Sequence, residues 1–316
     1  NKIMFNDASQ FIQGSSATVL SLGATDEIDL TATLIDINGN ADVSGTVTAT
    51  GTSVFASLDI SGDIDVDGTA NLDAVDVDVS LTVDGTVKLN GNFPTGTDNV
   101  ALGNDALSDG SLSGAGNIAI GDSAAKALTS GSNAIAIGRD AMSAAVFTGS
   151  DAVGVGRSTL AALTSGSNNV AVGALAGNSL TEGTQNVLLG TTVGDALTDA
   201  DFNVAAGFEA LKTEDTSGSA TAIGYQALRL QNSGGSNSYN TAVGVSAGTA
   251  VTTGNQNTLL GSLAGTSLTD ADFNVALGMS SLEADTLGSK STALGFQTLK
   301  NQNFTTATDS FNVAVG

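Results

Sequence analysis

A five-residue pattern of alternating apolar and small residues recurs through the last two thirds of the chain. Each copy has a first residue that is most often Asn, then a β-branched, a small and an aliphatic residue, and it ends in glycine, as in NVAVG. Thirteen copies lie between residues 99 and 316. The alternation has the period of two that a β-strand requires. Each copy therefore predicts one short strand that ends at its glycine.

The copies are spaced regularly enough to indicate one structural coil per repeat. The spacing is nearly constant, apart from two longer intervals that precede Gly244 and Gly316. The core glycines are Gly103, Gly121, Gly138, Gly156, Gly173, Gly190, Gly207, Gly224, Gly244, Gly261, Gly278, Gly295 and Gly316. Such a period is typical of solenoids, whose coils stack ~4.8 Å apart. The chain is therefore predicted to be all-β, with a parallel β-roll or β-solenoid of about 17-residue coils.

The first and last positions of the pattern carry further information. The first position is Asn in nine copies: Asn99, Asn117, Asn169, Asn186, Asn203, Asn240, Asn257, Asn274 and Asn312. Stacked asparagines can form a hydrogen-bonded ladder, and an invariant glycine suits a positive φ or a close backbone approach. We expect both features in the stack.

Four coils make up a larger repeat, in which Gly173 is equivalent to Gly244 and Gly190 to Gly261. ALTDADFNVAAG (196–207) and SLTDADFNVALG (267–278) differ at only two positions. At the fourth position after the core glycine, seven coils carry Leu or Met, and four carry Gly177, Gly194, Gly248 or Gly265. We interpret the second half of each coil as another short strand whose phase shifts between these two kinds.

A different repeat precedes the coils. Residues 36–91 show a 23-residue period rich in Val, Ile, Thr and Asp, which predicts short strands and tight turns. Pro94 separates the two repeat types, because proline cannot continue a central strand. The predicted organisation is an N-terminal connector (1–24), a short-strand repeat region (25–92) and a β-roll of thirteen coils (93–316).

Both faces of the core strand are apolar. Positions two and four carry Val, Ile, Leu or Thr in nearly every copy, whereas positions three and five carry mainly Ala and Gly. A strand that is apolar on both sides is normally covered on both sides. We expect the coil interior to cover one face, and another subunit to press against the small residues. A parallel homotrimer, intertwined or side by side, meets this requirement; a dimer, or a lone solenoid with a packed lateral domain, remains an alternative.

Composition argues against several function classes. The chain has no His and no Cys, so the commonest general base, metal ligand and thiol nucleophile are missing. Nine basic and 32 acidic residues give a net charge of −23, which disfavours nucleic acid and anionic lipid as partners. No apolar run is long enough to insert into a membrane. We predict a non-enzyme with no catalytic residue, cofactor or metal; the lack of Cys leaves the redox compartment open.

Several segments suggest chemistry, but each has a simpler structural interpretation. The Asp-rich stretches 59–68 and 72–80 resemble Ca²⁺ ligands in composition but lack a calcium-loop spacing, which favours solvated carboxylates. Asp199 with Asp201, and Asp270 with Asp272, are carboxylate pairs of the kind that cleave glycans, yet they are equivalent positions in a TDAD turn. The repeated glycines lack the Lys of a phosphate loop.

Two further sets of residues have simple interpretations as well. A regular column of Thr would suggest ice binding. Thr occupies the second core position in only four copies, however, and the array is too broken for that function: Thr221, Thr241, Thr258 and Thr292. The scattered phenylalanines are predicted to act as plugs and interface contacts rather than sugar platforms: Phe202, Phe208, Phe273, Phe296, Phe304 and Phe311.

The core motifs NVALG, NIAIG, NVAVG and NTAVG resemble the head repeats of trimeric autotransporter adhesins of the YadA type. The resemblance covers residues 99–316 and implies a trimeric, left-handed parallel β-roll, although the coils here are longer than is typical of that family. The segments KIMFNDASQFIQGSS and ATDEIDLTATLIDINGNADVSGT resemble parts of structural and tail-fibre proteins of marine bacteriophages, in which YadA-like head repeats also occur.

Together the resemblances imply a virion tail fibre that supports host attachment in the extracellular space. Its expected partners are its own copies, other virion or tail proteins, and a host-surface glycan or outer-membrane protein. The alternatives are the head of a bacterial trimeric surface adhesin, placed at the cell surface, and a glycan-cleaving tailspike. The ragged ends suggest a piece of a longer protein.

Overall fold

The computed structural model describes residues 2–5, 7–14, 16, 20–23, 46, 48, 97–144 and 146–316. The chain divides into two compact units, Asn1–Leu81 and Thr82–Gly316. The 23-residue repeat, both Asp-rich stretches and the predicted boundary at Pro94 lie outside the described residues, so these predictions remain predictions.

The described part of the first unit is a small antiparallel sheet. Strands β1 (Lys2–Phe5), β2 (Asp7–Gly14) and β3 (Leu20–Gly23) pair in chain order. Lys2 pairs with Gln13, and Phe11 pairs with Gly23. The segment predicted to be a simple connector therefore contains its own sheet.

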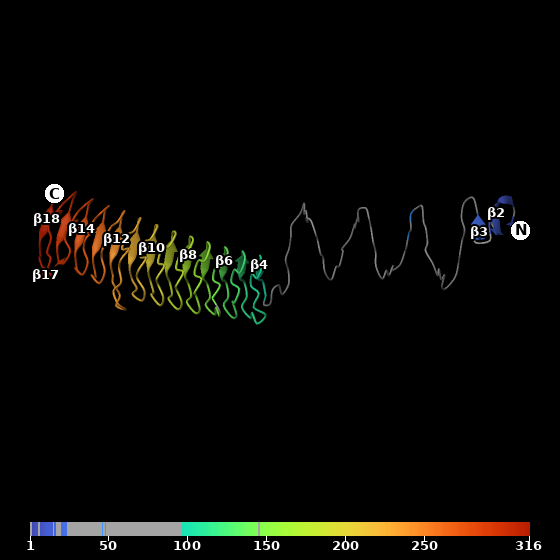
Figure 1. Cartoon of the computed structure of the whole chain (residues 1–316), viewed down its shortest axis with the longest axis horizontal. Coiled ribbons are helices and arrows are strands. Elements are labelled where there is room, and N and C mark those ends of the chain that lie inside the picture. The colour runs from blue at the N-terminus through green and yellow to red at the C-terminus, as the bar shows by residue number, and fades with distance from the viewer. Residues whose placement is uncertain are drawn as a thin grey trace. The chain divides into compact units, whose positions relative to one another are not determined.

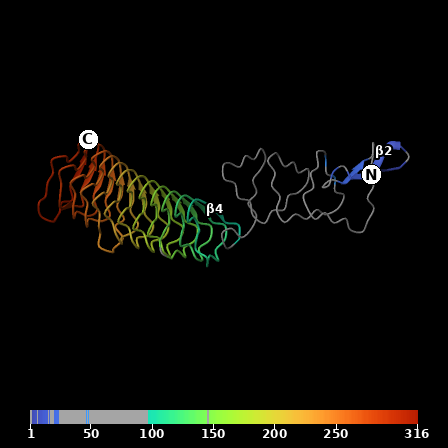
Figure 2. The ribbon, with the colours of Figure 1, turned by 45° about the vertical axis from the view of Figure 1, so that its right-hand side comes forward.

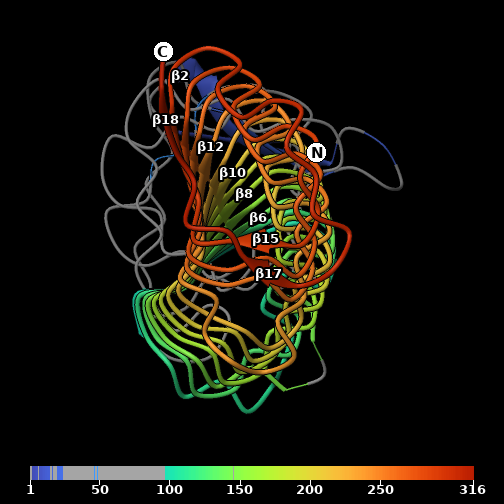
Figure 3. The ribbon, with the colours of Figure 1, turned by 90° about the vertical axis from the view of Figure 1, so that its left-hand side faces the viewer.

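The second unit is the predicted parallel β-solenoid (Figures 1 and 2). Thirteen strands form one parallel sheet in sequence order: β4 (Val100–Leu102), β5 (Ile118–Ile120), β6 (Ile135–Ile137), β7 (Val153–Val155), β8 (Val170–Val172), β9 (Val187–Leu189), β10 (Val204–Ala206), β11 (Thr221–Ile223), β12 (Thr241–Val243), β13 (Thr258–Leu260), β14 (Val275–Leu277), β16 (Thr292–Leu294) and β18 (Val313–Val315). A two-stranded parallel sheet joins β15 (Gly288–Ser289) to β17 (Thr308–Asp309). Register is strict, so that Ala119 lies beside Ala136 and equivalent positions form columns along the stack (Figure 3).

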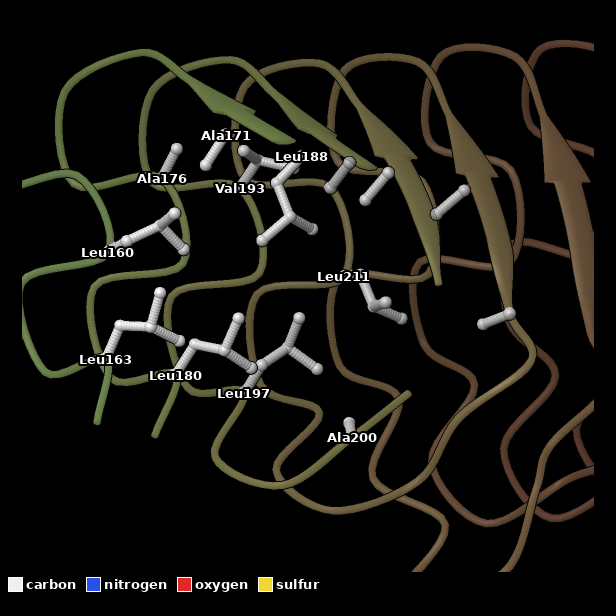
Figure 4. Close-up of a cluster of buried hydrophobic side chains, with 14 of the residues drawn as sticks. Leu160, Leu163, Ala171, Ala176, Leu180, Leu188, Val193, Leu197, Ala200 and Leu211 are labelled. Atoms are coloured by element: carbon white, nitrogen blue, oxygen red, sulfur yellow. The ribbon is translucent and has the colours of Figure 1, made fainter. Parts of the chain in front are cut away.

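The interior of each coil is lined by the third core position. Ala119, Ala171 and Leu188 are fully buried there. Figure 4 shows Ala171 and Leu188 together with leucines from the turns, such as Leu163 and Leu180. The second and fourth positions face outward. The prediction that the Ala and Gly face would meet another subunit is therefore wrong. A coil with a single strand encloses a narrow space that the turn leucines already fill, so only a small residue usually fits inside.

The second half of each coil is a turn in the described residues, apart from β15 and β17, so the predicted second strand is also wrong. At the fourth position after the core glycine, the backbone is left-handed in both kinds of coil: φ is 51° at Leu160 and 56° at Gly177. The two kinds of coil therefore have the same backbone conformation at this position. In the Gly kind, a leucine at a third core position fills the space. A Cβ added to Gly177 would lie 2.7 Å from the Leu188 Cδ1 atom, and one added to Gly248 would lie 2.7 Å from the Leu259 Cδ1 atom.

The asparagine ladder is confirmed and buried. The Oδ1 atom of Asn169 accepts hydrogen bonds from the backbone N–H (3.0 Å) and the side-chain amide (3.1 Å) of Asn186. Asn186 in turn accepts from the N–H of Asn203 at 3.0 Å and donates to the Ala200 carbonyl at 2.8 Å. Each amide thereby satisfies polar backbone groups at the corner that leads into the strand.

The expectation for the core glycines is confirmed too. Gly173 has a φ of 134°. A Cβ placed on it would lie 2.3 Å from the Gly190 carbonyl oxygen of the next coil. Stacking at this corner therefore needs glycine both for its conformation and for the close approach.

Candidate functional site: the outer face of the sheet

The second and fourth core positions form a continuous apolar surface, which we call the outer face. Its second-position column is Val100, Ile118, Ile135, Val153, Val170, Val187, Val204, Thr221, Thr241, Thr258, Val275, Thr292 and Val313. Its fourth-position column is Leu102, Ile120, Ile137, Val155, Val172, Leu189, Ala206, Ile223, Val243, Leu260, Leu277, Leu294 and Val315. Leu189 is 42% exposed and Val172 is 40% exposed. Contiguous exposed apolar surfaces are typical of interaction sites in other proteins.

Two columns of side chains border the outer face. The leading flank is the residue directly before each core: Asp98, Gly116, Asn133, Asp151, Asn168, Gln185, Phe202, Ser219, Tyr239, Gln256, Phe273, Lys290 and Phe311. The trailing flank is the residue directly after each core glycine: Asn104, Asp122, Arg139, Arg157, Ala174, Thr191, Phe208, Tyr225, Val245, Ser262, Met279 and Phe296. The backbone is left-handed at every leading-flank residue, as at Asp151 (φ 56°), and φ is also positive at the glycines that precede the trailing flank, as at Gly156 (140°), so both flanks lie where the chain turns at the ends of the strand.

The flanks change character along the solenoid. From Asp98 to Thr191 they carry polar, charged or small residues. Beyond that point most of them are aromatic or apolar, although Ser219, Gln256, Ser262 and Lys290 are not. Phe202 is 55% exposed, Phe208 44%, Tyr239 58% and Phe296 62%. The prediction that these phenylalanines act as plugs is wrong for Phe202, Phe208, Phe273, Phe296 and Phe311, which lie on the surface, whereas Phe304 is half-buried. A role as interface contacts stays a prediction.

Aromatic and charged side chains also interact along the flanks. The rings of Phe208 and Tyr225, in neighbouring coils, stack with centroids 5.7 Å apart and an interplanar angle of 14°. The Lys290 ammonium lies 5.2 Å from the centroid of the Phe311 ring and forms a 2.5 Å ion pair with Asp309. These contacts pre-order the flank residues within one chain.

An ion-pair cluster stands beside the trailing flank. Glu209 accepts hydrogen bonds from Lys212 (2.6 Å), Arg229 (2.7 Å) and Gln226 (2.9 Å). The Lys212 bond, followed by those of Arg229 and Gln226, lowers the pKa of the Glu209 carboxyl from 4.5 to about 2. The cluster links two neighbouring coils.

Two equivalent buried polar clusters support the two longest coils, and the sequence patterns did not reveal them. In the first, Glu214 accepts from Gln231 at 3.0 Å and from the Ser217 N–H at 3.1 Å, and Asn240 donates to Gln231 at 2.9 Å. In the second, at the equivalent place of the next four-coil block, Gln302 donates to Asp285 at 2.6 Å, and the Phe304 N–H donates to the same carboxylate at 2.9 Å. A usable signal was present: the polar residues replace the leucine found at this position in other coils.

The candidate catalytic carboxylates bond to the preceding coil. The Oδ1 atom of Asp199 accepts from the Thr181 hydroxyl at 2.8 Å, and Asp201 accepts from the Thr184 N–H at 2.6 Å. In the other block, Asp270 accepts from the Thr253 hydroxyl at 2.5 Å, and Asp272 accepts from the Asn255 N–H at 2.7 Å. These bonds tie successive turns together, as expected for a structural role.

The described residues contain no group of three or more acidic, His or Cys side chains placed to hold a metal ion. Within the same part of the chain, no helix has the length and apolarity to span a membrane.

No family model matches this chain, and no curated protein or solved structure shows significant similarity to it.

Proposed function

We propose that the chain is a structural segment of an extracellular fibre, a phage virion tail fibre that supports host attachment, and that its copies associate through the outer face. The observation that carries the proposal is the outer face, whose fourth core position is aliphatic in all thirteen parallel strands. A surface of this size is energetically costly in water and is covered when copies associate. A trimer is the state implied by the resemblance of the core repeats.

The bacterial adhesin head remains the alternative within the same class, because the core motif resembles both groups of proteins. The sequence that flanks this segment in the full gene product separates them. A coiled-coil stalk with a membrane anchor favours the adhesin, and a baseplate-binding start or a C-terminal self-cleaving chaperone favours the phage fibre.

Self-association is tested by measuring the mass of the purified chain by light scattering coupled to size exclusion. We expect the mass of three chains for the wild type. Val172→Glu places a charge on the outer face and is expected to shift the mass toward one chain. Val172 is 40% exposed, so the single chain accommodates the change without loss of fold, which circular dichroism checks. Ser130→Glu, an exposed position away from the outer face, is the matched control. A monomeric wild type would overturn the proposal.

The proposal that the chain is not an enzyme has its own test. The fibre is incubated with host surface polysaccharide, and new reducing ends are measured. We expect none, since each of the nominated Asp pairs is engaged in bonds between coils. If wild-type turnover occurs and Asp199→Asn with Asp201→Asn removes it, the tailspike hypothesis replaces the fibre hypothesis.

A further inference from the structure

One loop of the solenoid is longer than the turns around it. The coil that ends at Gly244 has 20 residues, whereas the next coil, which ends at Gly261, has 17. The additional residues lie in the segment 232–239, which we call the long loop, and it projects beyond the turns of the neighbouring coils beside β12 (Figure 1). Gly234 has a φ of 64°, and a Cβ added to it would meet no atom within 4 Å. This glycine therefore serves the shape of the loop and not the stacking of coils.

Buried polar side chains hold the base of the long loop. Glu214 and Gln231 are fully buried at the position where several other coils carry a leucine. The Gln231 amide donates to Glu214 at 3.0 Å and to the Ser238 hydroxyl at 3.0 Å. The Gly235 N–H donates to the Ser217 hydroxyl oxygen at 3.2 Å. The start, the middle and the end of the loop are therefore all attached to the base or to the preceding coil.

This base costs stability that a leucine would not cost. Glu214 forms no salt bridge with any described Lys or Arg. Burying a carboxylate without a cation is unfavourable, and hydrogen bonds offset only part of the cost. Because other coils stack without such a cluster, we interpret it as the device that fixes the long loop in one conformation. A loop that is ordered in advance loses less entropy when it binds a ligand.

The long loop presents hydrogen-bonding groups and one aromatic ring. Asn232, Ser236 and Asn237 are exposed, and the Asn237 amide donates to the Tyr239 hydroxyl at 3.3 Å. Tyr239 is 58% exposed, and among the described residues its ring takes part in no aromatic stack or cation–π contact. Residues 230–269 form the longest stretch of the chain without a charged residue. A ligand at this loop therefore meets amides, hydroxyls and a free ring face.

These groups suit a neutral saccharide better than a protein. Amides and hydroxyls both donate and accept hydrogen bonds, as the hydroxyls of a sugar do, and the Tyr ring offers an apolar face to the C–H groups of a sugar ring. The loop has no charged side chain to pair with a carboxylate or phosphate on a ligand. A stable protein interface takes about 20–30 residues from each partner, which is far more than this loop supplies.

We propose that the long loop is a binding site for a neutral saccharide, in which the Tyr239 ring stacks on a sugar ring and the Asn232 and Asn237 amides bond its hydroxyls. Each copy in a fibre displays the loop, so weak single sites combine into firm attachment. This inference rests on the proposed function in host attachment, and it adds the site and the chemical class of the ligand.

An array of uncharged and acidic oligosaccharides tests the proposal, and calorimetry then measures the affinity for the oligosaccharide that binds best. We expect the wild type to bind uncharged members of the array. Tyr239→Ala should weaken binding about tenfold, because it removes the stacking surface. Asn237→Ala should weaken binding about fivefold through the loss of hydrogen bonds. Tyr239→Phe keeps the ring and should bind nearly as well as the wild type.

Phe311→Ala is the matched control. Phe311 is an exposed aromatic residue directly before the core of the other long coil, but Lys290 lies over its ring at 5.2 Å from the centroid. We expect this variant to bind like the wild type. Circular dichroism and light scattering verify that every variant keeps the fold and the mass of the wild type. A variant that loses binding only together with a change in mass counts against the loop as the site.

The remaining outcomes separate this inference from the proposed function. If the wild type binds uncharged oligosaccharides and both alanine variants in the loop bind equally well, the long loop is not the site, and the attachment function stands. If the wild type binds only acidic oligosaccharides, or binds host cells only until their surface protein is digested, the class of ligand is wrong, and the attachment function stands. If the wild type binds neither the array nor host cells, the attachment function fails, and the inference fails with it.

Discussion

At the scale of single residues, the asparagine ladder is the polar counterpart of the apolar interior. Each amide accepts from the next coil and donates to a carbonyl, so one side chain satisfies two backbone groups that are shielded from water. Asn186 is fully buried and forms both kinds of bond.

We predict that Asn186→Ala destabilises the solenoid by about 3 kcal/mol, because it leaves the Asn203 N–H and the Ala200 carbonyl buried without partners. Urea denaturation followed by circular dichroism measures the loss. Asn178→Ala, in the same turn region but with a half-buried side chain, is the control and should be nearly neutral. Equal effects of the two substitutions would contradict a special role for the ladder.

In the interior, coils with a leucine at the third core position carry a glycine four residues after the core glycine, where other coils carry a leucine. Leu188 is large where most coils carry Ala, and Gly194 of the same coil lacks the Leu that others carry, such as Leu211. A Cβ added to Gly194 would lie 2.7 Å from the Leu197 Cδ1 atom and 3.0 Å from the Leu188 Cδ2 atom. The Leu188 side chain thus fills the space that a leucine at the position of Gly194 fills in other coils.

Leu188→Ala alone should destabilise by about 2–5 kcal/mol through a cavity, and Gly194→Leu alone should destabilise by overpacking. The double variant recreates the composition of the neighbouring coil, with its Ala205 and Leu211 at equivalent positions. In a double-mutant cycle, we expect the double variant to lose roughly 1–3 kcal/mol less stability than the two single variants lose together. Strict additivity would show that the two sites do not share one space.

At the scale of elements, the sequence predicted the strand, its glycine corner, the ladder and the stacking, because each depends on residues within one repeat. It misplaced the interior, since Val and Ile are the larger apolar residues and size suggested that they belong inside. The space enclosed by a coil with one strand, bounded by Leu163 and Leu180, was not visible in the repeat itself. The Glu214 and Asp285 clusters were missed because they interrupt the repeat rather than form part of it.

The ion-pair cluster around Glu209 joins two turns and makes stability depend on pH. The pKa of Glu209 in the folded chain is about 2, below its ordinary value of 4.5. A carboxyl with a lowered folded pKa contributes stability that is fully present above the unfolded value and is lost as pH falls through the folded value. The contribution therefore disappears between about pH 4.5 and pH 2.

We predict that Glu209→Gln is less stable than the wild type at pH 7, and that the difference narrows across this window. Thermal unfolding at a series of pH values gives the comparison. Glu182→Gln, at an exposed carboxylate of another turn, serves as the control, and its difference from the wild type should stay nearly constant. If the difference in stability between Glu209→Gln and the wild type does not change with pH, the ion pairs are not its cause.

At the scale of the whole molecule, a net charge of −23 opposes association, whereas the outer face favours it. Charge repulsion is screened over ~10 Å at 0.1 M salt, and the apolar contribution is not. Raising the salt should therefore strengthen the proposed association of copies through the outer face.

Mass photometry across a dilution series, repeated at several salt concentrations, measures the dissociation constant of the proposed oligomer. If raising the salt weakens the oligomer, attraction between charges rather than the apolar outer face holds the copies together.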